Sequence, residues 1–147
     1  MKRIKILCAG FILGACAVLH AQKISHPLVG VWQQLALQKT EGDKLFYSQV
    51  PVWKVYQQDG AYSVFMIASQ SGFSIKTAEG TYTIDNDSTY TEFIRDSGAN
   101  PDIQGKNNAL KYSIAQNKIL TVRYTLPGRT QEASEVWTRV DFLPKQK

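Results

Sequence analysis

Charged and aromatic side chains alternate along several apolar stretches of the sequence, at a spacing that places them on one face of a β-strand. Glu135, Trp137 and Arg139 share a face near the end of the chain, and Tyr90 and Glu92 do so near its middle. If these faces point inward, two acids and two bases meet among aromatic rings. The candidate ligand-binding residues are therefore Trp53, Tyr90, Glu92, Arg123, Glu135 and Trp137.

Three interpretations of this polar set stay open. The charges could form cross-strand pairs on the surface, each adding little stability. They could pair inside the fold, because a buried charge without a partner is costly. They could also receive a polar ligand. On the last strand, Val136, Val140 and Phe142 alternate on the opposite face and read as an ordinary core stripe.

Catalytic sets are hard to assemble from these residues. Glu92 and Glu135 could serve as the paired carboxylates of a glycoside hydrolase, which need a defined separation across a cleft. His26 is the only histidine after residue 21, and no cysteine follows that residue. A Ser-His-Asp triad and a zinc site are therefore not expected. We predict a non-enzymatic protein with no catalytic residue, no metal and no cofactor.

The segments that would carry these residues read as β-strands. Aromatic and β-branched runs are separated by turn signals at intervals of about ten residues. Asp59-Gly60, Asn86-Asp87 and Gln116-Asn117 mark three hairpin turns. A strand is expected around 81–85, and residues 95–108 read as a long loop.

Consecutive hairpins predict an all-β fold with up-and-down antiparallel order and eight to nine strands. Closing such a sheet into a barrel removes its exposed edges, and the barrel can hold side chains or one small ligand. An open sandwich of two sheets is the alternative. Helical turns are expected at most near residues 40–48 and 98–106.

The N-terminus has the pattern of a secretion signal. A positively charged start precedes the uncharged apolar run 6–19, which is shorter than the roughly 20 residues of a membrane-spanning helix. We expect cleavage after Ala21, giving a signal peptide over 1–21 and a single β-barrel domain over 22–147. The protein would then be periplasmic or secreted. Cys16, in a stretch like a lipobox, offers a lipid anchor as the less favoured alternative.

Removing this segment changes the charge balance. Three of the 17 basic residues precede residue 21, whereas all 12 acidic residues follow it, so the formal charge falls from +5 to +2. Nothing in this balance favours a nucleic-acid partner. Both cysteines, Cys8 and Cys16, also belong to the leader, so no disulfide is expected.

Gly30 and Trp32 open the first apolar run, in LVGVWQQL. A glycine allows close backbone approach, and the large ring can plug the base of a barrel. Arg139, on the last strand, could cover Trp32 in a cation–π contact worth about 0.5–2 kcal/mol. A Gly-x-Trp on the first strand beneath an arginine of the last strand resembles the lipocalin and calycin pattern.

A wider resemblance covers nearly all of 22–147. HPLVGVWQ, PVWKVYQQDGAY, GTYTID, YTEF, ILTVRY and EVWTRV resemble a lipocalin-like family of unknown function from exported Bacteroidetes proteins, DUF4488. The resemblance implies a small calycin-type barrel and no established activity. Gly30, Trp32 and Arg139 then serve the fold.

The leading hypothesis is an exported, cofactor-free binding protein with a small apolar or amphiphilic ligand in the barrel mouth. A cavity below about 300 Å³, the lower end for ligand pockets, would count against it. The alternative is an interaction or accessory module of the cell envelope with a solidly packed barrel. A glycan-acting hydrolase is a distant third. No transmembrane span is expected.

Overall fold

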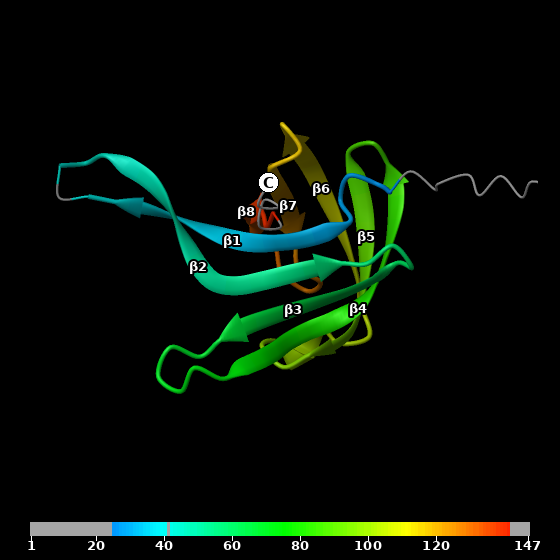
Figure 1. Cartoon of the computed structure of the whole chain (residues 1–147). Coiled ribbons are helices and arrows are strands. Elements are labelled where there is room, and N and C mark those ends of the chain that lie inside the picture. The colour runs from blue at the N-terminus through cyan, green and yellow to red at the C-terminus, as the bar shows by residue number, and fades with distance from the viewer. Residues whose placement is uncertain (1–24, 41, 142–147) are drawn as a thin grey trace, which may run out of the picture.

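Eight strands account for most of what the computed structural model describes, residues 25–40 and 42–141. In chain order they are β1 (Gly30–Lys39), β2 (Leu45–Tyr56), β3 (Ala61–Ile67), β4 (Ser74–Asn86), β5 (Thr89–Ser97), β6 (Asn107–Ala115), β7 (Ile119–Thr125) and β8 (Glu132–Arg139). Each pairs antiparallel with the next, and β8 pairs with β1, so the sheet closes (Figure 1). The predicted all-β, up-and-down barrel is confirmed.

The seam between the first and last strands is short. It runs over four residue pairs, from Trp32 opposite Arg139 to Leu35 opposite Val136. β1 continues beyond the seam to Lys39, paired only with β2. The β1–β2 and β3–β4 hairpins reach out beyond the rest of the barrel on the left of Figure 1.

The predicted turns are confirmed, and several boundaries differ. β4 begins at Ser74, well before the strand expected around 81–85, because pairing with β3 extends it through a segment without clear alternation. The loop expected over 95–108 is shortened at both ends by β5 and β6. It contains a 3-10 turn, η1 (Pro101–Ile103). No helical turn forms over 42–48, where β2 begins at Leu45.

Trp32 fills one end of the barrel, which we call the closed end. The ring is fully buried and its Nε1 donates a hydrogen bond of 2.8 Å to the carbonyl of Leu28. The guanidinium carbon of Arg139 lies 4.1 Å from the Trp32 ring centroid. Arg139 also donates to the carbonyls of Val29 at 2.9 Å and Asn117 at 2.8 Å. The Arg139 side chain, which we call the lid, therefore connects β8 to the N-terminal segment and to the β6–β7 turn by hydrogen bonds.

Gly30 makes room for this lid. Its φ of +143° lies in a region that side chains disfavour, and a Cβ there would stand 2.5 Å from Nη1 of Arg139. The backbone conformation therefore favours glycine, and a side chain here would displace the guanidinium group from its hydrogen bond to Val29.

The inward face of β8 is the one that carries Glu135, Trp137 and Arg139. The predicted core stripe on the opposite face is wrong: Val136 is only half-buried, and Val140 is exposed and lies beyond β8. Phe142 is outside the described residues. Trp137 is the buried residue of the inward face, and hydrogen bonds from Tyr124 and Trp137 satisfy the half-buried Glu135 beside it.

The interior is rich in tyrosine. The buried cluster comprises Leu28, Trp32, Tyr56, Tyr62, Tyr90, Leu110, Leu120, Val122 and Trp137.

Among the described residues there is no helix with the length and hydropathy needed to cross a membrane.

We predict that Gly30→Ala destabilises the fold by about 2 kcal/mol through backbone strain, and further by displacing the Arg139 side chain. Urea unfolding measures the loss. In an Arg139→Ala background, where the displaced group is gone, the cost of Gly30→Ala should shrink.

Gly128→Ala is the matched control. Gly128 also has a positive φ, +80°, but a Cβ there meets no atom within 4 Å. Its cost should be the same with and without Arg139. Equal costs for Gly30→Ala in both backgrounds would contradict the role given to the close approach.

Candidate functional site

A cavity of about 140 Å³ lies inside the barrel, toward the end opposite Trp32. Ile103 of η1 and Leu126 of the β7–β8 connection line it, and both follow strands that run away from the closed end. It therefore occupies the barrel mouth, and we call it the mouth cavity.

The lining of the mouth cavity is divided between polar and apolar residues. The polar ones are Lys54, Tyr62, Glu92, Asn108, Tyr124 and Glu135. The apolar ones are Val64, Ala78, Ile94, Ile103, Leu110 and Leu126. On β3 and β5 the apolar residue lies two positions nearer the mouth than its polar neighbour, as with Ile94 beyond Glu92, whereas on β6 the polar Asn108 lies nearer the mouth than Leu110.

A buried ion pair forms part of the polar lining. Nζ of Lys54 lies 2.6 Å from Oε1 of Glu92, and both side chains are more than nine-tenths buried. The hydroxyl of Tyr56 donates to the same oxygen at 2.7 Å and lies 2.6 Å from the hydroxyl of Tyr90. The ammonium also lies 5.1 Å from the ring centroid of Tyr62. These contacts offset the cost of burying two charges.

Glu135 has a different environment. Its two carboxylate oxygens accept hydrogen bonds from the hydroxyl of Tyr124 at 2.5 Å and from Nε1 of Trp137 at 3.1 Å. Within the described part of the chain, no cation lies within ion-pair distance of it. Two neutral donors therefore fix the carboxylate in place without neutralising it.

Asn108 contributes a buried polar group that lacks a partner. It is 4% exposed, and Oδ1 accepts no hydrogen bond from any group that the structure describes. Buried side-chain oxygens are almost always satisfied, so an exception calls for a functional or strain-related explanation. Asn108 lines the mouth cavity, although Oδ1 itself is enclosed by other protein atoms.

The buried phenols remain hydrogen-bond donors. Burial, followed by the nearby Glu92 charge, raises the pKa of Tyr56 and Tyr90 well above the ordinary value. Burial, then the Glu135 charge, raises the pKa of Tyr124 in the same way. The tyrosines that hold the two glutamates therefore stay protonated.

Two of the six candidate ligand-binding residues, Glu92 and Glu135, line the mouth cavity. Tyr90 and Trp137 are buried but do not line it; Tyr90 supports Tyr56, and Trp137 donates to Glu135. Arg139, expected in the same polar set, lies at the closed end over Trp32 instead.

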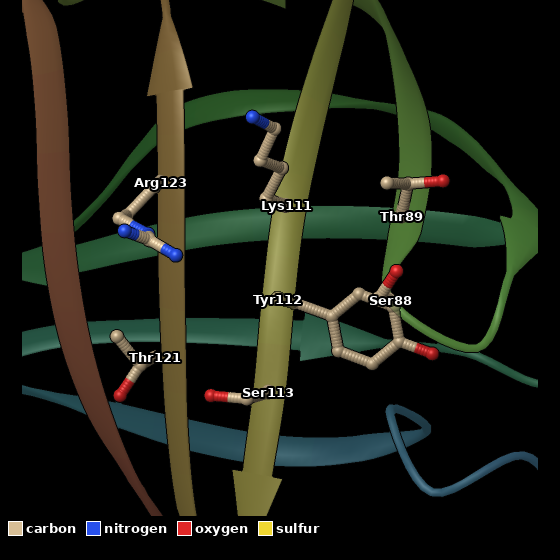
Figure 2. Close-up of a pocket in the computed structure, with 7 residues that line it drawn as sticks. All are labelled: Ser88, Thr89, Lys111, Tyr112, Ser113, Thr121 and Arg123. Carbon is tan, nitrogen blue, oxygen red and sulfur yellow. The ribbon is translucent and has the colours of Figure 1, made fainter.

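The prediction that Trp53 and Arg123 line a ligand site inside the barrel is wrong, because both lie on the outer wall. Directly opposed residues of neighbouring strands share a face, and Trp32 is opposed to Lys54, so Lys54 points inward and Trp53 outward. Arg123 is exposed. Figure 2 shows it near Lys111 and Thr121, around a depression formed on β6 and β7.

Sequence reasoning missed Lys54, Asn108, Tyr62 and Tyr124 as parts of the site. Lysine and asparagine are mostly exposed in folded proteins, so neither attracts attention within a strand. The alternation of Val52, Lys54 and Tyr56 was the available signal, but the adjacent Trp53 made the opposite face of β2 look equally apolar.

Within 25–40 and 42–141, the structure places no three or more His, Cys, Asp or Glu side chains together in a group that could hold a metal ion. The family model described as "Domain of unknown function (DUF4488)" matches residues 27–147. This match spans all eight strands and every residue of the mouth cavity. The chain has no match among curated proteins.

We predict that Lys54→Met costs about 3–5 kcal/mol of unfolding free energy, because it leaves the Glu92 carboxylate buried without a cation. The double variant Lys54→Met/Glu92→Gln should cost clearly less than the sum of the single variants. Chemical denaturation of all three gives the coupling energy. Strict additivity would contradict a compensated pair.

Lys118→Met serves as the control for losing a lysine. Lys118 lies 3.7 Å from Asp141, and both side chains are more than 60% exposed. An exposed pair of this kind contributes about 0–1 kcal/mol, so this variant should unfold close to the wild type.

We also predict that stability falls as pH rises above the ordinary tyrosine value of 10.0. Above it the unfolded chain loses phenolic protons that the folded barrel retains, so alkali favours unfolding. Tyr56→Phe should make the decline shallower. Denaturant unfolding at increasing pH, with phenolate absorbance, measures it. Phenolate forming at Tyr56 while the barrel stays folded would contradict the prediction.

Proposed function

The chain belongs to the DUF4488 family, and we propose that it is an exported, non-enzymatic binding protein that holds a small amphiphilic molecule in the mouth of its barrel. The observation that carries the proposal is the unpartnered Oδ1 of the buried Asn108, in a cavity whose lining is polar on some strands and apolar toward the opening.

The volume of the cavity narrows the choice of ligand. At about 140 Å³ it is below the roughly 300 Å³ of ordinary ligand pockets. By the criterion stated in the sequence analysis, this volume counts against the binding hypothesis, and it leaves room only for a ligand smaller than those of larger lipocalin-type cavities. An apolar cavity of about 150 Å³ accommodates benzene, so a single ring or a short chain fits the available space.

The distribution of polarity favours an amphiphile over a purely apolar molecule. Burying hydrocarbon against Glu135 and Asn108 would remove solvent from the charged Glu135 oxygens and leave Oδ1 of Asn108 without a donor, which is costly. A ligand with a polar head among these oxygens and a hydrocarbon part near Ile94 and Leu126 satisfies both parts of the lining.

A binding role accounts better than hydrolysis for the two glutamates. Glu92 is held by Lys54 and Tyr56, and Glu135 by Tyr124 and Trp137. Both line one small cavity, where a chain of sugars would have little room. This favours a holding function over the paired-carboxylate alternative.

Export is supported by the sequence of residues 1–21, which lie outside the described residues. The charged start, the apolar run and Ala21 are typical of a signal peptide. A calycin-type relationship is supported by Trp32 beneath Arg139 at the closed end. An anchor at Cys16 is the alternative form of the same export hypothesis.

An interaction module of the cell envelope is the second candidate. It is favoured by exposed apolar residues on the two long hairpins, which are Leu37, Leu45, Tyr47 and Phe73. Surfaces of this kind often mark contact sites. In that role the barrel would be a scaffold and the cavity would have no ligand.

The decisive experiment is a titration of the purified, natively processed chain with benzyl alcohol, monitored by heteronuclear NMR. We expect saturable shifts at cavity residues such as Ala78 and Ile94. Ala78→Leu, which fills part of the cavity, should abolish them. Thr121→Leu places the same leucine side chain on the outer wall and should leave binding unchanged.

Absence of saturable binding, or binding that survives Ala78→Leu, would overturn the proposal. The interaction-module alternative would then gain support.

A further inference from the structure

The charges that line the mouth cavity do not balance. Lys54 and Glu92 neutralise each other at 2.6 Å. Glu135, the remaining carboxylate of the lining, has no cation within ion-pair distance in the part of the chain that the structure describes. The cavity therefore carries one formal negative charge that the fold positions but does not compensate.

The groups of the lining that can still form hydrogen bonds are acceptors, which suits a positively charged donor. Oδ1 of Asn108 is an acceptor without a donor among the described residues. The oxygens of Glu135 are acceptors too, with capacity left beyond the Tyr124 and Trp137 bonds, because an ionised carboxylate can accept about four hydrogen bonds. A suitable occupant therefore supplies N–H donors and a positive charge.

We propose that the mouth cavity binds a compact organic ammonium ion, a primary amine with a small hydrocarbon body. Its three N–H donors face the oxygens of Glu135 and Asn108, and its hydrocarbon part lies toward Ile94 and Leu126. This assignment rests on the proposed binding function and adds the chemical class of the ligand.

Other ligand chemistries fit the lining less well. An anion would face Glu135 and could reach only a lysine already paired with Glu92. A neutral alcohol can donate to Asn108 but leaves the charge of Glu135 uncompensated. Calcium takes six to eight oxygen ligands, and the described residues form no cluster of the required kind.

The test compares three probes with one ring and different heads: benzylamine, benzyl alcohol and benzoate. Calorimetric titration of the natively processed chain at neutral pH gives the three affinities. We expect benzylamine to bind about tenfold more tightly than benzyl alcohol, since a hydrogen bond between charged groups is about twice as strong as a neutral one. Benzoate should bind least.

Variants test which side chains cause the difference in affinity between benzylamine and benzyl alcohol. Glu135→Gln keeps the shape and removes the charge, so it should weaken benzylamine about tenfold and weaken benzyl alcohol far less, because the alcohol loses only one contact to a neutral amide. Glu132→Gln is the matched control, because it removes the same charge from an exposed position on β8 and should change neither probe.

Asn108→Leu is a second variant that does not disturb the bonds to Glu135. It removes a buried acceptor without a partner, so folding should be maintained while benzylamine binds more weakly. It keeps the test informative if Glu135→Gln fails to fold.

The outcomes separate the two claims. If benzyl alcohol binds as tightly as benzylamine, or if neither Glu135→Gln nor Asn108→Leu affects benzylamine, the ammonium assignment is overturned and binding in the mouth stands. If none of the three probes binds, the proposed function itself fails.

Discussion

Closing a sheet on itself obliges every second side chain of each strand to lie inside the barrel. The rest of this structure depends on how that constraint is met. Trp32 and the side chains directly opposite it, Lys54 and Arg139, must all face inward together. One of these cations is then met by a carboxylate, Glu92, and the other by a ring and backbone carbonyls. The polar interior is therefore a consequence of closure and is stabilised locally.

The two ends of the barrel meet the constraint in different ways. At the closed end, Arg139 is surrounded by acceptors and Trp32 leaves no space. Toward the mouth, Oδ1 of Asn108 lacks a hydrogen-bond donor among the described residues, and a cavity remains. Tyr56 and Tyr90 connect these regions through hydrogen-bonded hydroxyls. Rigidity at one end thus supports a site at the other, on side chains whose positions are fixed by their neighbours.

The sequence predicts the parts of this fold that depend on local or paired signals. Turn residues such as Asp59 and Gly60 determine the hairpins, and Trp32 with Arg139 predicts how the ends of the chain meet. Which face of each strand points into the barrel was harder to predict from the sequence. Trp53 is the more apolar neighbour of Lys54, yet the register with Trp32 turns Lys54 inward. Arg123 is likewise directed outward because Tyr124 lies opposite the buried Leu110. Such choices depend on pairing between distant segments, which composition alone does not reveal.

The short seam between β1 and β8 has a consequence for how the barrel opens. Four residue pairs join the ends of an otherwise continuous sheet, and β1 leaves the seam before it reaches the mouth. Local opening follows the regions with the fewest shared hydrogen bonds. Amide hydrogen exchange should therefore be faster along the mouth-side half of β1 than in β5 or β6. A molecule that entered the barrel would pass the least constrained part of the wall there. The time for which it stays bound would then depend on how often the β1–β8 seam opens locally.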